Sequence, residues 1–121
     1  MTYESWSRIE SRLAPGVSYR IVRMSLGRRI DLSRRVLELA QKVEFLEAGA
    51  STKEQMEARM LGQEIDRVYL LWGLQGIEGL ELDGEPATPE TFHRAGPEDL
   101  CREALEAIKA ECGLNEAERK N

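Results

Sequence analysis

Glu90 and His93 are the residues whose types and spacing come closest to a metal-binding or catalytic motif. They stand three positions apart in EPATPETFHRAGP, and carboxylate-bridged di-iron bundles use this Glu/His spacing. Such a site needs two of these motifs and two further glutamates, whereas His93 is the sole histidine of the sequence. The sequence therefore predicts no metal here, and we expect His93 on the surface of a short helix, next to Phe92.

Cys101 and Cys112 are the only cysteines. Both fall in one predicted helix, about 16 Å apart along its axis, which exceeds the Cα separation of about 7 Å that a disulfide can bridge. No Cys-x-x-Cys or paired-His spacing for zinc accompanies them. We expect both side chains on a buried apolar stripe.

The glycine-rich stretch at 73–84 lacks the features of a phosphate-binding loop. No Gly-Lys-Ser/Thr follows it, and no strand–glycine–helix order surrounds it. The carboxylates near the C-terminus are spread around a helix, with no apolar pocket to perturb their ionisation. The sequence thus predicts no catalytic residue, no cofactor and no enzymatic activity, and it assigns these glycines to turns and to a helix exit.

A group of four arginines, Arg28, Arg29, Arg34 and Arg35, is the candidate nucleic-acid surface. Acidic residues such as Asp31 alternate with them, few aromatic residues are interleaved, and the net charge is −5. Nucleic-acid binding is normally carried by a concentrated basic patch. A small DNA- or regulator-binding protein that uses the Arg28/Arg35 region is therefore the alternative function.

The net charge hides a strong polarity. Residues 1–43 hold nine Lys/Arg and four Asp/Glu, which gives +5, whereas residues 77–118 hold three Lys/Arg and twelve Asp/Glu, which gives −9. This asymmetry can be neutralised within the monomer, or it can promote head-to-tail association or the docking of a charged partner. We expect a homo-oligomer as one outcome.

Two long antiparallel helices are predicted at about residues 25–47 and 52–75. Ser25 caps the first, and Ala48-Gly49 ends it. Ser51 and Glu54 form a capping box that begins the second helix. The end of this second helix, from Val68 to Leu74, is apolar nearly all round, so we expect several elements or another subunit to enclose it, with Trp72 in the core.

Apolar residues on the first helix cover an arc wider than one helical neighbour requires. One flank holds Leu32, Leu39, Val43 and Leu46. The other holds Leu26, Ile30, Leu37 and Ala40. We expect one flank to pack internally and the other to face a partner, and we assign partner binding to the flank with Leu32, Leu39, Val43 and Leu46.

The remaining segments predict a small β element and further helices. Residues 17–23 alternate as a strand, residues 78–82 form a second strand that can pair with it, and Asp83-Gly84 marks a reversal. Residues 1–16 allow either a helix or a hairpin arm, since Trp6, Ile9 and Leu13 have helical spacing but Pro15-Gly16 is a turn signal. Thr88-Pro89 begins a short helix, and a C-terminal helix spans about 97–112.

The fold class is therefore mainly α (α+β): two long antiparallel helices plus a C-terminal helix with a small β element, in a single domain over 1–121. Apolar content of 41% and charged content of 32% are typical of a folded, soluble chain rather than a disordered one. No apolar run approaches the roughly 18–20 residues that cross a bilayer, and MTYESWSRIE is not a secretory signal. We expect no membrane partner and a location in the cytoplasm.

The chain resembles the small tail assembly chaperones of tailed phages and prophages. The resemblance lies in RMSLGRRIDLSRRV (23–36), EIDRVYLLWGL (64–74), GLELDGEPATPET (79–91) and GPEDLCREALEAIKAECGL (96–114). It covers nearly the whole chain as a pattern and an order rather than as a short invariant motif. It implies a non-enzymatic protein of the host-cell cytoplasm that binds the long tape-measure protein during tail morphogenesis, and it implies no cofactor.

Overall fold

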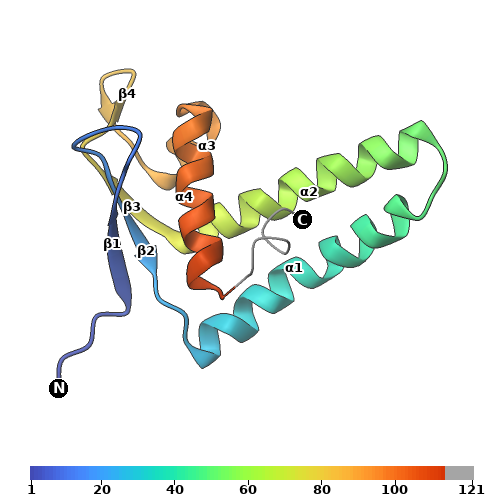
Figure 1. Ribbon diagram of the computed structural model, residues 1–121, viewed down its shortest axis with the longest axis horizontal. Helices are drawn as coiled ribbons and strands as arrows, with labels where there is room; N and C mark the ends of the chain where they lie inside the picture. The colour runs from blue at the N-terminus through green and yellow to red at the C-terminus, as the bar shows by residue number, and fades with distance from the viewer. Residues whose placement is uncertain (114–121) are drawn as a thin grey trace.

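Two long helices dominate the structure, a computed structural model that describes residues 1–113 (Figure 1). They are α1 (Leu26–Glu47) and α2 (Thr52–Gly73), and they run antiparallel. Ser25 caps α1, since its hydroxyl oxygen accepts from the backbone N–H of Arg28 at 3.2 Å. Ser51 caps α2 in the same way through Glu54 N–H, at 3.1 Å, and its hydroxyl also donates to the Glu54 carboxylate, at 2.8 Å. Both predicted N-cap serines are confirmed. The capping box predicted for α2 is formed only in part, since the Glu54 carboxylate accepts from the Ser51 hydroxyl and not from its backbone N–H.

The small β element is a three-stranded antiparallel sheet in the order β1-β2-β3. Its strands are β1 (Trp6–Glu10), β2 (Ser18–Val22) and β3 (Leu74–Glu78). The N-terminal segment is thus a hairpin arm and not a helix. The strand expected at 78–82 begins four residues earlier, because α2 ends at Gly73 and Leu74 pairs with Ile21 of β2.

The segment after β3 contains a two-residue hairpin and two more helices. Strands β4 (Glu81–Leu82) and β5 (Glu85–Pro86) flank the predicted reversal, where Asp83 and Gly84 both have positive φ, 54° and 83°. Thr88 caps α3 (Pro89–Ala95) by accepting from Thr91 N–H at 3.2 Å. The C-terminal helix is α4 (Glu98–Glu111). The predicted fold class is confirmed.

The hydrophobic core lies where α4 crosses between the sheet and the C-terminal end of α2 (Figure 1). Its buried members are Val17, Tyr19, Ile21, Leu32, Leu70, Leu74, Phe92, Leu100, Ala104, Ile108 and Cys112. Cys101 is half-buried against this core, and both thiols are free, as expected. The buried face of α4 includes Ala104 and also Lys109, while Leu105 is only half-buried.

Glu103 of α4 fastens the β1–β2 turn to the helix. Its carboxylate accepts from Ser11 Oγ at 2.5 Å, from Tyr19 Oη at 2.8 Å and from the backbone N–H groups of Arg12 and Leu13 at 2.9 and 3.3 Å. Burial opposes the charge on Glu103, but these hydrogen bonds outweigh it and lower the pKa of the carboxyl group. One ionised side chain thereby holds the turn of the hairpin against α4.

We predict that Glu103→Gln lowers the free energy of unfolding at pH 7 by about 1.5 kcal/mol, the usual size for hydrogen bonds to a partly exposed charge. A carboxyl group with a lowered folded pKa stabilises the fold above its unfolded pKa of about 4.3, and this stabilisation is lost as the pH falls through the folded value. The difference between wild type and variant in urea unfolding should therefore shrink below about pH 4. The exposed Glu44→Gln is the control, and an equal pH response of both variants contradicts the prediction.

Candidate protein-binding surface

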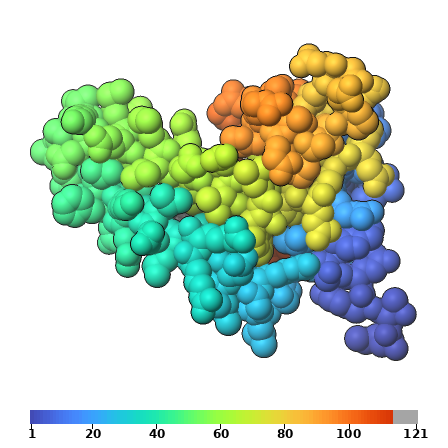
Figure 2. All heavy atoms as spheres, turned by 180° about the vertical axis from the view of Figure 1, so that it is seen from behind, coloured from blue at the N-terminus to red at the C-terminus, as the bar shows by residue number. Residues whose placement is uncertain are grey.

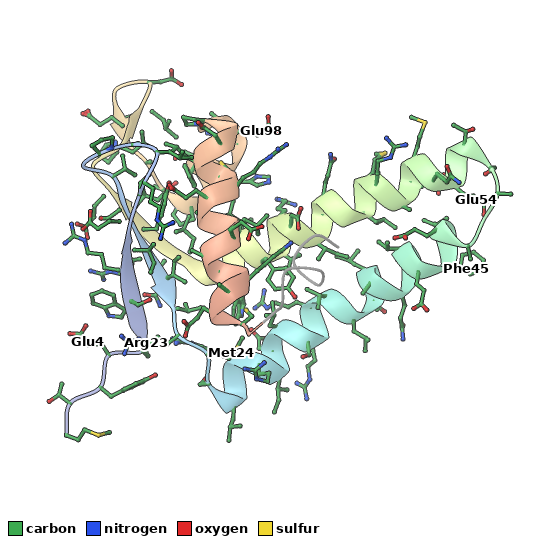
Figure 3. The ribbon with its side chains drawn as sticks, viewed as in Figure 1. Glu4, Arg23, Met24, Phe45, Glu54 and Glu98 are labelled. Carbon is green, nitrogen blue, oxygen red and sulfur yellow. The ribbon has the colours of Figure 1, made fainter. Side chains whose placement is uncertain are left out.

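The outer parts of α1 and α2 project from the rest of the molecule as a two-helix arm, residues 37–65 (Figure 1). Figure 3 shows Phe45 and Glu54 at its far end. The core cluster reaches only as far as Leu32 on α1 and Leu70 on α2. Within the arm, Ala58 and Ile65 are the buried residues. Two helices alone cannot enclose a core, so much of the apolar surface of this arm stays in contact with solvent.

The face of α1 that packs on α2 is an inner seam with alternating spacings of four and three residues. It consists of Leu32, Val36, Leu39, Val43 and Leu46. Leu32 is 6% exposed, and the other members are half-buried, with Val43 beside Ala58 and Leu46 beside Leu61. This spacing keeps side chains on one face toward an antiparallel neighbour.

The structure places the residues predicted to bind a partner on the inner seam and not on the exposed flank: Leu32, Leu39, Val43 and Leu46. They belong to the inner seam, because α2 returns along that side of α1. Leu32 is a core residue and offers no surface at all. Substitutions such as Leu39→Glu or Val43→Glu would disturb the packing of α1 on α2 and cannot test partner binding by themselves.

The opposite flank is the exposed one, and we call it the outer seam. It consists of Leu26, Ile30, Ser33, Leu37 and Ala40, which again follow a four-three-four-three spacing. Leu26 is 87% exposed, and Ile30 and Leu37 are each 56% exposed. The expected division of α1 into a packed flank and a free flank is thus present, with the two flanks exchanged.

The arm carries exposed apolar side chains of its own near its tip. Phe45 is 75% exposed, and Met56 and Met60 of α2 are 55% and 66% exposed. Phe45 forms one wall of a hollow of about 500 Å³ between the two helices, together with Leu46 and Leu61. Phe45, Met56 and Met60 belong to neither of the two flanks predicted from the sequence, although each is a large apolar residue with a charged residue directly beside it.

Positive charge borders the outer seam. Arg35 is paired with Asp31 at 3.0 Å. Arg28 donates to the backbone carbonyl groups of Ser5 and Arg23, and Arg29 donates to the carbonyl group of Cys112 at 3.3 Å. Of the four arginines at 28, 29, 34 and 35, Arg35 alone has a carboxylate within ion-pair distance among residues 1–113. The basic half of the charge polarity is thus incompletely neutralised on α1.

The apolar end of α2 is enclosed on only one side. Leu70, Gly73 and Leu74 are buried against α3, α4 and the sheet, as predicted. Trp72 is half-buried instead of fully buried, and its Nε1–H donates to Asp31 Oδ2 at 3.2 Å. The indole therefore bridges the two long helices at the base of the arm and borders an open hollow.

We predict that Trp72→Ala costs about 2 kcal/mol of unfolding free energy, below the 3–5 kcal/mol typical of a fully buried aromatic side chain. Trp72→Phe should cost about 1 kcal/mol, since it keeps most of the contact area and removes the hydrogen bond to Asp31. Urea unfolding followed by circular dichroism measures both. A cost below about 0.5 kcal/mol for Trp72→Ala, the level of ordinary surface substitutions, contradicts a structural role for the indole.

A polar hollow of about 550 Å³ separates α2 from α3, and Figure 2 shows the surface indented between them. His93 lies exposed at its rim, as expected for a helix-surface histidine. Glu64 and Glu90 line it beside Arg67 and Arg94, so its walls carry both signs of charge. Within residues 1–113, no three His, Cys, Asp or Glu side chains are grouped closely enough to hold a metal ion.

None of the helices among the described residues is long and apolar enough to cross a membrane. Comparison with protein-family models, with curated proteins and with solved structures finds no match for this chain.

Proposed function

We propose that this chain is a non-enzymatic tail assembly chaperone that binds the tape-measure protein of a tailed phage or prophage. The observation that carries the proposal is the outer seam, a mostly apolar and exposed row along a helix that, among residues 1–113, packs mainly on one other helix, α2. A long helical client offers apolar side chains at i, i+3, i+4 and i+7, and such a row fits against an exposed helix face.

The physical case for a chaperone rests on the combination of apolar and charged surface. Leu26, Ile30 and Leu37 offer contact area, while arginines and glutamates on the other faces of α1 keep the free protein soluble. The identity of the client rests on the sequence resemblance alone. A host-cell cytoplasmic location, and self-association of the chain, belong to the same proposal.

The alternative, DNA or regulator binding through Arg28 and Arg35, has less support. Arg35 is already paired with Asp31, and Arg28 is held by the backbone carbonyl groups of Ser5 and Arg23. Both guanidinium groups would have to leave these partners to contact phosphate, so the region is not arranged as a phosphate-binding surface.

Co-expression with the tape-measure protein of the same genome tests the proposed function. We expect the client to be soluble and to co-purify with this chain, and to be insoluble when expressed alone. Binding should persist in high salt, whereas DNA affinity falls steeply with salt because counterions are released. A client that stays insoluble in the presence of this chain, or a chain that binds duplex DNA at low salt and loses it at high salt, contradicts the proposal.

A further inference from the structure

We propose that the outer seam binds an acidic amphipathic helix, in which apolar residues at heptad spacing are flanked by glutamate or aspartate. This inference rests on the proposed function, since it specifies the chemistry of the partner at the same surface. It is carried by two independent features of α1: the four-three spacing of the outer seam, in which Ser33 is the one polar member, and the charge on both edges of that row.

The outer seam has the geometry of one half of a two-helix interface. Leu26, Ser33 and Ala40 occupy one class of heptad position, and Ile30 and Leu37 occupy the other. The row is about 21 Å long, since it spans fourteen steps of about 1.5 Å. A partner helix of about three heptads therefore covers it from end to end.

The edges of the outer seam are basic. Arg29 directly precedes Ile30 on one edge, and Arg34 directly follows Ser33 on the other. These are the positions that form charge pairs across helix interfaces and that decide partner and orientation. Both side chains are exposed, and no carboxylate among residues 1–113 lies within ion-pair distance of them. Arg29 donates to the backbone carbonyl group of Cys112, whereas no such bond is formed by Arg34 within these residues. A partner with acidic residues at the facing positions supplies the missing charges.

The same charges disfavour a second copy of this chain as the occupant. In a parallel pairing, Arg29 of one copy faces Arg34 of the other, because flanking positions of successive heptads meet across the seam. Two antiparallel registers align the apolar positions of the two copies. In one register Arg34 lies opposite Arg34 of the other copy, and in the other register it lies next to Arg28 of the other copy. Like charges across an interface are repulsive, so the seam selects an acidic helix over itself.

Designed peptides test the inference directly. The probe is a labelled helix of about three heptads with leucine at the apolar positions and glutamate at the flanking ones, and its counterpart carries lysine at the flanking positions. Fluorescence anisotropy should show that the full chain binds the glutamate peptide at least about tenfold more tightly than the lysine peptide. Equal binding of both peptides, or binding of neither, overturns the inference.

Two pairs of variants locate the binding site. Ile30→Asp should weaken binding of the glutamate peptide about tenfold or more, since it places a charge in the apolar row. Met56→Asp, at an equally exposed position on α2, should not weaken it. Arg34→Glu should weaken the glutamate peptide and strengthen the lysine peptide, each about threefold to tenfold, and Arg59→Glu should do neither. Loss of binding in both control variants, or no loss in Ile30→Asp, places the site elsewhere and overturns the inference.

Light scattering tests whether a second copy of this chain occupies the outer seam. If the wild type is a dimer that Ile30→Asp converts to a monomer, a second copy occupies the seam and the inference is wrong. Failure of the inference and failure of the proposed function are also distinguishable. If the tape-measure protein co-purifies equally with wild type and Ile30→Asp, the proposed function stands but the acidic-helix site is refuted. If the glutamate peptide binds at the outer seam but the tape-measure protein does not bind, the acidic-helix site stands and the proposed function is refuted.

Discussion

Asp66→Ala should lower the free energy of unfolding by about 3 kcal/mol, because it removes a carboxylate that pairs with a buried cation. Lys109 Nζ donates to Asp66 Oδ1 at 2.9 Å, and the Lys109 side chain is 5% exposed while that of Asp66 is 41% exposed. The ammonium group also lies 5.5 Å from the ring centre of Tyr69. Chemical denaturation at neutral pH measures the loss.

The asymmetry of the pair gives a sharper test than the single variant. Lys109→Met should cost less than about 1 kcal/mol, because it leaves a carboxylate that water can still reach and replaces the buried charge with an apolar side chain of similar length. The double variant should recover most of the loss caused by Asp66→Ala. The exposed pair Arg102–Glu98, at 2.7 Å, is the control, and Glu98→Ala should change stability by at most about 0.5 kcal/mol. Equal costs for Asp66→Ala and Glu98→Ala refute the role assigned to Lys109.

Helix starts could be predicted from the sequence because the signals that begin a helix are local. Ser25, Ser51 and Thr88 each cap a helix through a backbone N–H three residues later. The reversal at Asp83-Gly84 was equally predictable, since the backbone there needs positive φ. Each of these features depends on residues no more than three positions apart, so the local sequence is enough to predict it.

The N-terminal strand could not be predicted, because long-range pairing decides it. Trp6 and Ile9 have helical spacing, but in the sheet they lie on opposite faces: Trp6 stands against Arg20, whose guanidinium carbon is 4.0 Å from the ring centre, and Ile9 pairs with Tyr19. Antiparallel pairing with β2, together with the hydrogen bonds from the β1–β2 turn to Glu103, stabilises a strand in place of the helix that the local spacing suggests. Nothing within residues 1–16 identifies Glu103 as their partner.

The presence of a free apolar flank on α1 could be predicted from the sequence, but which of the two flanks is free depends on long-range packing. The sequence shows that α1 carries more apolar surface than one neighbour can cover, but both seams have the same four-three spacing, and only the return path of α2 decides which is inner. One signal does separate them. The inner seam is apolar at all five positions, whereas Ser33 interrupts the outer seam, and an uninterrupted row is the better core face.

Gly73→Ala should lower the free energy of unfolding by about 2–3 kcal/mol, because the added Cβ meets a packed core side chain. A Cβ built at Gly73 lies 2.5 Å from Ile108 Cγ2 and 3.0 Å from its Cγ1, and Ile108 is 1% exposed. Gly62 lies in the same helix with nothing within 4 Å of its added Cβ, so Gly62→Ala should stabilise by about 0.5–1 kcal/mol through helix propensity. In urea unfolding, Gly73→Ala combined with Ile108→Ala should cost less than the sum of the two single variants, because Ile108→Ala removes both γ carbons that the added Cβ meets. If both alanine variants stabilise the protein, α2 does not pack on α4 as closely as this contact requires.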